Sequence, residues 1–149
     1  MNRLILLGVV MLLTIQAQSQ SVKEKEVPKV VLQKMLSLYP DAKNVKWEME
    51  DGMYEGEFKQ NKSEVSVILS RDGMVAATEM EVEVATLPAG LLNYIADNYP
   101  GAVISEAAKV TDSKGMVSYE LEIGGDDYIF DASGNLISQS PSDHGKKED

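Results

Sequence analysis

Two stretches of this chain, sixty positions apart, repeat one pattern of residues. Residues 27–42 read VPKVVLQKMLSLYPDA, and residues 87–102 read LPAGLLNYIADNYPGA. Shorter matches follow in the same order, between 54–58 and 119–123 and between 67–73 and 128–134. Ordered self-similarity of this kind indicates a tandem duplication, in which each copy supplies the same run of secondary structure.

Each copy begins with the pattern of an amphipathic helix, because apolar residues recur at a spacing of three to four. These residues are Val27, Val31, Met35 and Leu38 in the first copy and Leu87, Leu91 and Ile95 in the second. A proline, Pro28 or Pro88, lies in the first turn, where its missing N–H costs nothing. A Tyr-Pro pair ends each helix, since the residue before proline is pushed out of the helical region.

After each helix the period changes to two, which is typical of strands. Asp51-Gly52 and Asp72-Gly73 separate alternating segments of the first copy, and such pairs are strong hairpin signals. We therefore predict an α+β fold of two tandem repeats, each one helix followed by a three- to four-stranded antiparallel meander. The repeats are expected to span residues 27–86 and 87–140, with the apolar face of each sheet buried under its own helix.

The two ends of the chain lie outside these repeats. Residues 1–19 carry a basic residue, Arg3, then an uncharged apolar run and small residues up to Ser19, which is the pattern of a cleaved export signal. The run is shorter than the roughly 20 apolar residues that a membrane span needs. Residues 20–26 are interpreted as a polar leader and 141–149 as a flexible tail. We expect a periplasmic or secreted protein without a membrane span in the mature chain.

Composition excludes several kinds of chemistry. The chain has 24 acidic and 14 basic residues, a formal net charge of -10, one histidine and no cysteine. Without cysteine there is no disulfide, thiolate nucleophile or thiolate-bound metal. The histidine, His144, lies in the predicted tail and cannot serve a catalytic triad. The acidic balance disfavours nucleic acid, whose phosphates require a basic surface. We therefore expect no enzyme activity, no cofactor and no metal site.

Glutamates at alternating positions are the most conspicuous polar feature. Glu79, Glu81 and Glu83 form a straight row, which does not converge as the ligands of a calcium ion must, so we interpret them as a solvated strand face. Four further glutamates recur in both copies and predict an acidic outer surface that attracts a basic partner. They are Glu55, Glu57, Glu120 and Glu122, and they form our candidate partner surface.

Two other features have structural interpretations. Asp131-Ala132-Ser133-Gly134-Asn135 shares residue types with a calcium loop, but it lacks the twelve-residue span and the closing glutamate, so a turn is expected. Trp47 could line a binding groove, since aromatic residues anchor interfaces. It alternates in phase with Val45 and Met49, however, and we expect it to pack inward beneath the helix.

The ordered motifs resemble those of the PepSY-like family of β-lactamase-inhibitor-like proteins. They are Tyr39–Ala42, Tyr54–Phe58 and Asp72–Gly73 in the first copy and Tyr99–Ala102, Tyr119–Ile123 and Ser133–Gly134 in the second. The resemblance covers nearly all of residues 27–140. It implies a tandem α+β fold with two sheets side by side. In the inhibitory relatives the joined sheets form a concave face that grips an enzyme, and PepSY domains are linked to restraint of secreted peptidases.

Function is predicted in general terms. The leading hypothesis is an exported, non-enzymatic binding module that recognises a protein or peptide in the periplasm, and restraint of an enzyme such as a peptidase is one form of that role. The alternative is a small-ligand or cation-binding protein of the cell envelope. The enzyme-contacting residues of the inhibitory relatives do not map onto this chain, and their disulfides are absent.

Overall fold

The computed structural model describes residues 20–141. The predicted export signal in residues 1–19, the tail beyond residue 141 and His144 lie outside the described residues. Within the described part, the α-helices are α1 (Lys29–Leu38) and α2 (Ala89–Asn98), and short 3-10 turns, η2 (Glu24–Glu26) and η3 (Val84–Thr86), precede them. The strands are β1 (Gln20–Val22), β2 (Lys46–Glu50), β3 (Met53–Gln60), β4 (Ser63–Leu69), β5 (Val75–Glu81), β6 (Ile104–Asp112), β7 (Val117–Ile123), β8 (Asp126–Asp131) and β9 (Leu136–Pro141).

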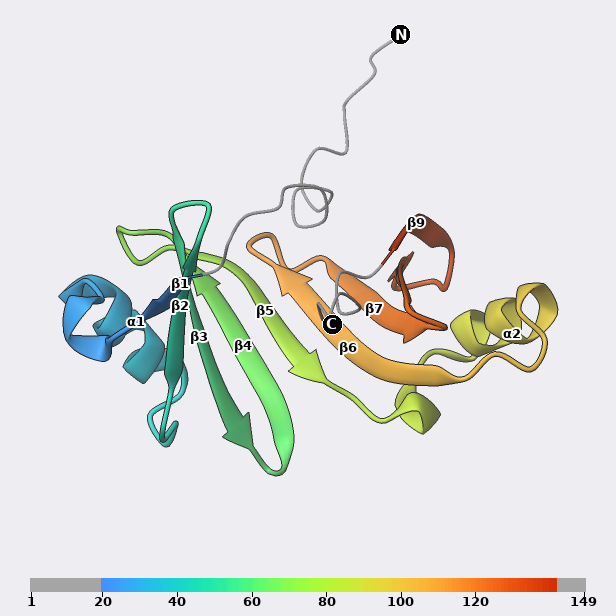
Figure 1. The fold of residues 1–149 in the computed structure, drawn as a ribbon, viewed down its shortest axis with the longest axis horizontal. Helices are drawn as coiled ribbons and strands as arrows, with labels where there is room; N and C mark the ends of the chain where they lie inside the picture. The colour runs from blue at the N-terminus through green and yellow to red at the C-terminus, as the bar shows by residue number, and fades with distance from the viewer. Residues whose placement is uncertain (1–19, 142–149) are drawn as a thin grey trace, which may run out of the picture.

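All these strands belong to one antiparallel sheet, in which each strand pairs with the next along the chain from β1 to β9. Figure 1 shows the sheet running the length of the molecule, with α1 and α2 at opposite ends. The centre is the pairing of β5 with β6, from Ala77 opposite Asp112 to Glu81 opposite Ala108. Helix α2 lies between these two strands in the sequence, so their pairing is not a hairpin.

The predicted fold class is therefore wrong. The chain does not form two repeats that each consist of one helix and its own meander; residues 20–141 are nearly all β, with one nine-stranded sheet and two α-helices. The physical reason lies at β5 and β6. Two separate meanders would leave each of these strands with a row of unpaired N–H and C=O groups. Pairing β5 with β6 satisfies both rows and makes the sheet continuous.

The sequence repetition is visible as a recurring register within this sheet. In the β1–β2 pairing Gln20 lies opposite Met49, and sixty positions later Met80 lies opposite Lys109 in the β5–β6 pairing. The end of β5 thus pairs with β6 in the same register in which β1 pairs with β2. Residues 20–26, interpreted from the sequence as a leader, form this first strand and η2, and Val22 packs against the core.

The two helices form where the sequence predicts them. Pro28 and Pro88 are the N-cap residues of α1 and α2, one position before the helical residues begin. Each helix ends at its Tyr-Pro pair, where the N–H of Tyr39 donates to the carbonyl of Met35 at 2.9 Å and that of Tyr99 to the carbonyl of Ile95 at 2.8 Å. The helix predictions are confirmed to within two residues.

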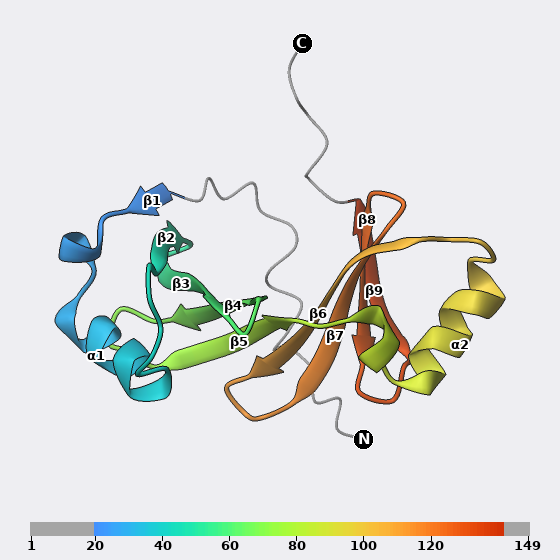
Figure 2. The ribbon, with the colours of Figure 1, turned by 90° about the horizontal axis from the view of Figure 1, so that it is seen from below.

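Both helices cover the same face of the sheet, and the sheet curves away from them so that its two ends bend toward the opposite side (Figure 2). We call that opposite side the concave face. Under α1 the buried core comprises Val27, Val31, Met35, Trp47, Tyr54, Phe58, Val65, Val67 and Leu69. Under α2 it comprises Leu87, Leu91, Ile95, Ala107, Leu121, Ile123, Tyr128 and Phe130. The inward packing of Trp47 is confirmed, because the residue is only 4% exposed.

Candidate functional site

The concave face carries acidic side chains because of strand alternation. Residues directly opposite each other in an antiparallel pair point to the same face, and their sequence neighbours point to the other. Glu57 lies opposite Ser66, Ser66 opposite Glu79, and Glu79 opposite Val110. Val65 and Val67, the neighbours of Ser66 along β4, belong to the core under α1. The row that contains Ser66 therefore faces away from the helices. The same alternation places glutamates from β2 to β7 on one surface.

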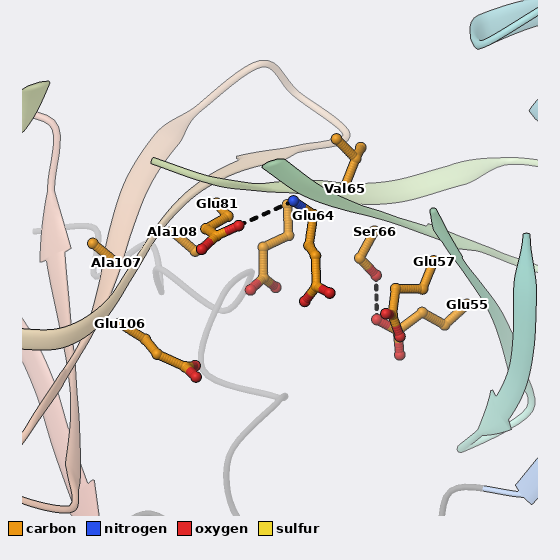
Figure 3. Close-up of a pocket in the computed structure, with 10 residues that line it drawn as sticks. Glu55, Glu57, Glu64, Val65, Ser66, Glu81, Glu106, Ala107 and Ala108 are labelled. Atoms are coloured by element: carbon orange, nitrogen blue, oxygen red, sulfur yellow. Dashed lines mark hydrogen bonds between the residues drawn. The ribbon is translucent and has the colours of Figure 1, made fainter. Parts of the chain in front are cut away.

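A hollow of about 230 Å³ lies on the concave face, where β3, β4, β5 and β6 run side by side. Its lining consists of Glu55, Glu57, Glu64, Val65, Ser66, Glu79, Glu81, Glu106, Ala107 and Ala108. Figure 3 shows the carboxylates of Glu57, Glu64 and Glu106 extending to the same side of the sheet. The hollow is smaller than the roughly 300–1,000 Å³ of pockets for small molecules. Its size suits one inserted side chain.

The four residues of the candidate partner surface all lie on the concave face. Glu55 and Glu57 line the hollow. Glu120 lies close enough to Glu79 to raise the pKa of the Glu79 carboxyl. Glu122 lies opposite Glu106 across β6 and β7, and its carboxylate accepts the hydroxyl of Ser105 at 2.6 Å. The fold therefore brings both pairs onto one surface, and their contact with a partner stays a prediction.

Two lysines of this face form ion pairs with glutamates. Lys46 Nζ lies 3.4 Å from Glu57 Oε1, and Lys59 Nζ lies 3.1 Å from Glu64 Oε1. Lys109 lies opposite Met80 and Tyr119, on the face that the helices cover. Both ion pairs are at the surface and contribute little to stability. The centre of the concave face is therefore negative.

Glu79 differs from its sequence neighbours in the predicted solvated row. It is half-buried at the centre of the sheet, and this burial raises the pKa of its carboxyl to about 7, with further contributions from Glu120, Glu55 and Glu106. Glu81 is exposed and lines the hollow, whereas Glu83 is exposed and lies beyond the end of β5. The interpretation as a solvated strand face therefore holds for Glu81 and is wrong for Glu79, whereas Glu83 is solvated but lies outside the strand.

The sequence analysis does not identify Glu64 and Glu106 as part of the site. It also does not predict the half-buried position of Glu79. Each lies in an alternating segment, so their common face could be read from the sequence. Their proximity depends on the pairing of β4 with β5 and of β5 with β6. No local pattern reports the second pairing.

The structure gives no support to a cation site within residues 20–141. No three acidic or histidine side chains in this range are grouped so that they could hold a metal ion. Asp131 forms the turn that the sequence predicts, because its carboxylate accepts the backbone N–H groups of Ser133 at 2.8 Å and Asn135 at 2.9 Å. In the same range, neither helix has the length and apolar character needed to span a bilayer.

Comparison of the sequence finds no matching protein-family model and no match among curated proteins. Comparison of the structure finds solved proteins with the same fold. A DUF2874 family protein from Bacteroides uniformis is 18% identical, with a TM-score of 0.73 over 80% of this chain and 92% of the other. A protein from Bacteroides eggerthii, described as periplasmic, is 18% identical, with a TM-score of 0.72 over 77% of this chain and 88% of the other.

A third solved structure is described as a BLIP-like protein from Bacteroides fragilis. It is 18% identical to this chain, with a TM-score of 0.65 over 82% of this chain and 92% of the other. At such identities the likeness shows the fold alone. The predicted likeness to β-lactamase-inhibitor-like proteins is thus confirmed for the fold, and the PepSY-like assignment stays a prediction. The chain has the BLIP-like fold of DUF2874 family proteins.

Proposed function

We propose that this chain is an exported, non-enzymatic binding module of the periplasm, which holds a basic segment of a protein or peptide against its concave face. The observation that carries the proposal is the continuous curved sheet, with six glutamates around one hollow at its centre. A surface of one charge sign steers and selects partners of the opposite sign.

The curvature supports a macromolecular partner. Both ends of the sheet bend toward the concave face, so a protein segment laid across it contacts several strands at once (Figure 2). The hollow, at about 230 Å³, accommodates one lysine or arginine side chain of that segment rather than a whole small molecule. A basic segment also pairs with carboxylates without any convergent ligand geometry, which a metal ion would require.

The periplasmic location has two supports. The sequence predicts an export signal in residues 1–19. One of the solved structures with this fold is described as a periplasmic protein. The BLIP-like description of another neighbour favours a protein partner. We propose restraint of an enzyme such as a peptidase as one form of this binding.

A capture experiment tests the proposal. The bait is the wild-type protein, and the comparison bait replaces all four residues of the candidate partner surface by glutamine, at Glu55, Glu57, Glu120 and Glu122. Each bait is immobilised and incubated with a periplasmic extract, and the bound proteins are identified by mass spectrometry. We expect wild type to retain a defined protein with a basic surface segment, released by salt, and the glutamine variant to lose it.

A matched control uses glutamates of the exposed 3-10 turns. Glu24 and Glu83 are exposed, and neither lines the hollow. A variant with both replaced by glutamine should retain the same protein as wild type. Equal capture by all three baits, or no salt-sensitive capture by wild type, would contradict a role of the concave face.

A further inference from the structure

Glu79 is surrounded by carboxylates that come from the strands on both sides of β5. Its direct neighbours across the sheet are Ser66 on β4 and Val110 on β6, and neither carries a charge. The acidic groups that line the same hollow or act on Glu79 are Glu55 and Glu57 from β3, Glu64 from β4, Glu81 from β5, Glu106 from β6 and Glu120 from β7. Adjacent strands lie only about 5 Å apart, so these groups repel one another.

No cation within residues 20–141 relieves this repulsion at Glu79. Lys46 and Lys59 pair with Glu57 and Glu64 at 3.4 and 3.1 Å. Both lysine side chains are largely exposed, at 74% and 71%, so they stay at the margin of the hollow. Glu79 itself forms no ion pair with a described residue. Its charge must therefore be balanced from outside the cluster.

A proton or a positive group of a partner can supply that balance. Desolvation and like charges both disfavour the ionised carboxyl, and they raise the pKa of Glu79 to about 7. A lysine or arginine entering the hollow would stabilise the ionised carboxylate of Glu79, so that the proton is released.

We propose that the glutamate cluster around Glu79 is a proton-operated switch of the concave face: Glu79 holds a proton in mildly acidic solution and gives it up when a basic segment docks. The docking half of this inference rests on the proposed function. The proton uptake is a property of the protein alone, so the two halves are tested separately.

The direction of the pH effect follows from linkage. The carboxyl of an unfolded glutamate loses its proton near its ordinary pKa of 4.5, whereas folded Glu79 keeps its proton up to about 7. Between pH 4.5 and about 7 the folded state therefore binds more protons than the unfolded state. The stabilisation that this proton gives is complete below pH 4.5 and is lost as the pH rises through about 7. Docking of a basic segment should show the opposite trend and strengthen as pH rises.

The first experiment measures urea unfolding of the protein alone at pH 5, 6, 7 and 8. The urea midpoint of wild type should fall as pH rises, and Glu79→Gln should remove most of that fall. Glu83→Gln is the matched control, since it removes the same charge four positions along and outside the hollow. A wild-type curve with the same pH dependence as Glu79→Gln would overturn the proton uptake.

The second experiment titrates a lysine decapeptide into the protein at pH 6 and pH 8. A carboxyl with a pKa of about 7 is about one-tenth ionised at pH 6 and about nine-tenths ionised at pH 8. The association constant of wild type should therefore rise about tenfold between these pH values, and that of Glu79→Gln should change much less.

The outcomes distinguish the two proposals. If wild type binds the peptide at neither pH while circular dichroism shows it folded, the proposed function fails, and the unfolding series alone decides the proton uptake. If wild type binds with the same pH dependence as Glu79→Gln, the switch fails and the proposed function stands. Nuclear magnetic resonance of the glutamate carboxyl carbons gives a further check, because the switch requires a Glu79 signal that titrates near neutral pH.

Discussion

A hydrogen atom is the whole side chain at position 56, and the ring of Trp47 lies directly over it. A methyl group placed there would lie 3.0 Å from two ring atoms of Trp47 and 3.3 Å from a side-chain atom of Val45. Such distances are well inside van der Waals contact, so the ring would have to move. Gly56 and Trp47 are also direct partners in the β2–β3 pairing. Glycine therefore sets the depth at which the indole packs under α1.

We predict that Gly56→Ala lowers the free energy of unfolding by about 1–3 kcal/mol through overpacking. The measurement is urea unfolding followed by far-ultraviolet circular dichroism, because the variants in the Trp47→Phe background contain no tryptophan. Trp47→Phe in the same background supplies the control, because a smaller ring leaves room for the added methyl. In the double-mutant cycle the alanine should cost clearly less beside phenylalanine than beside tryptophan. Equal costs in both backgrounds would show that the ring contact is not the cause.

Two turns with similar sequences differ in whether they pack against a helix. Gly115 in the β6–β7 turn and Gly134 in the β8–β9 turn both have positive φ, at 79° and 87°. The N–H of Gly115 donates to the carbonyl of Asp112, and the N–H of Gly134 donates to the carbonyl of Asp131, both at 3.0 Å. Only Gly134 meets α2, because a methyl group there would lie 2.5 Å from the backbone nitrogen of Leu91. Nothing lies within 4 Å of such a group at Gly115.

This pair predicts two different costs for one substitution. Gly115→Ala should lose about 1–2 kcal/mol, the usual penalty of a left-handed backbone for a residue with a Cβ. Gly134→Ala carries the same penalty and also pushes the turn away from α2, so it should lose about 1–3 kcal/mol more. Thermal unfolding of both variants gives the comparison. A cost for Gly134→Ala no greater than that for Gly115→Ala would refute the packing of the turn against α2.

Local patterns of the sequence predict the helices and most strands but not which strands meet. The spacing around Val31 and Leu91 and the Tyr-Pro pairs define α1 and α2, because helix formation depends on neighbours within one turn. β1 was missed, since its three residues are too few for a periodic signal. The sequence does not settle the pairing of β5 with β6, because α2 separates these strands in the chain and alternation indicates which face a residue lies on but not which strand is its partner.

The candidate site shows the same division. The concave position of Glu55, Glu57, Glu120 and Glu122 follows from alternation alone. The half-burial of Glu79 does not, because Glu79 and Glu81 alternate in the same way, and only the strand pairing gives Glu79 direct neighbours on both β4 and β6. The sequence leaves open whether the sheets of the two repeats join, and therefore whether β5 is an edge strand or a central one.

Continuity of the sheet predicts how the molecule unfolds. The only tryptophan, Trp47, belongs to the core under α1, whereas Leu121 is fully buried in the core under α2. Leu121→Ala should lower the free energy of unfolding by about 2–5 kcal/mol. Because β5 and β6 join the two cores, Trp47 fluorescence and far-ultraviolet circular dichroism should report one transition with the same shifted midpoint.

An independent pair of units would behave differently. In that case Trp47 fluorescence of Leu121→Ala would keep the wild-type midpoint, and circular dichroism would show two steps. Val67→Ala, at a fully buried position under α1, is the reciprocal control and should also shift both signals together. Separate transitions in either variant would contradict a continuous sheet that folds as one body.

Charge is distributed unevenly over the molecule, and this bears most directly on function. Along β5 to β9 the only strand lysine is Lys109, which lies on the face that the helices cover, so the concave surface of that half is acidic. The decisive measurement is the affinity for a lysine decapeptide at several salt concentrations. We predict binding that weakens steeply with salt and a large loss of affinity when Glu55, Glu57, Glu120 and Glu122 are all glutamine. Affinity that is equal in wild type and this variant at low salt would contradict the account.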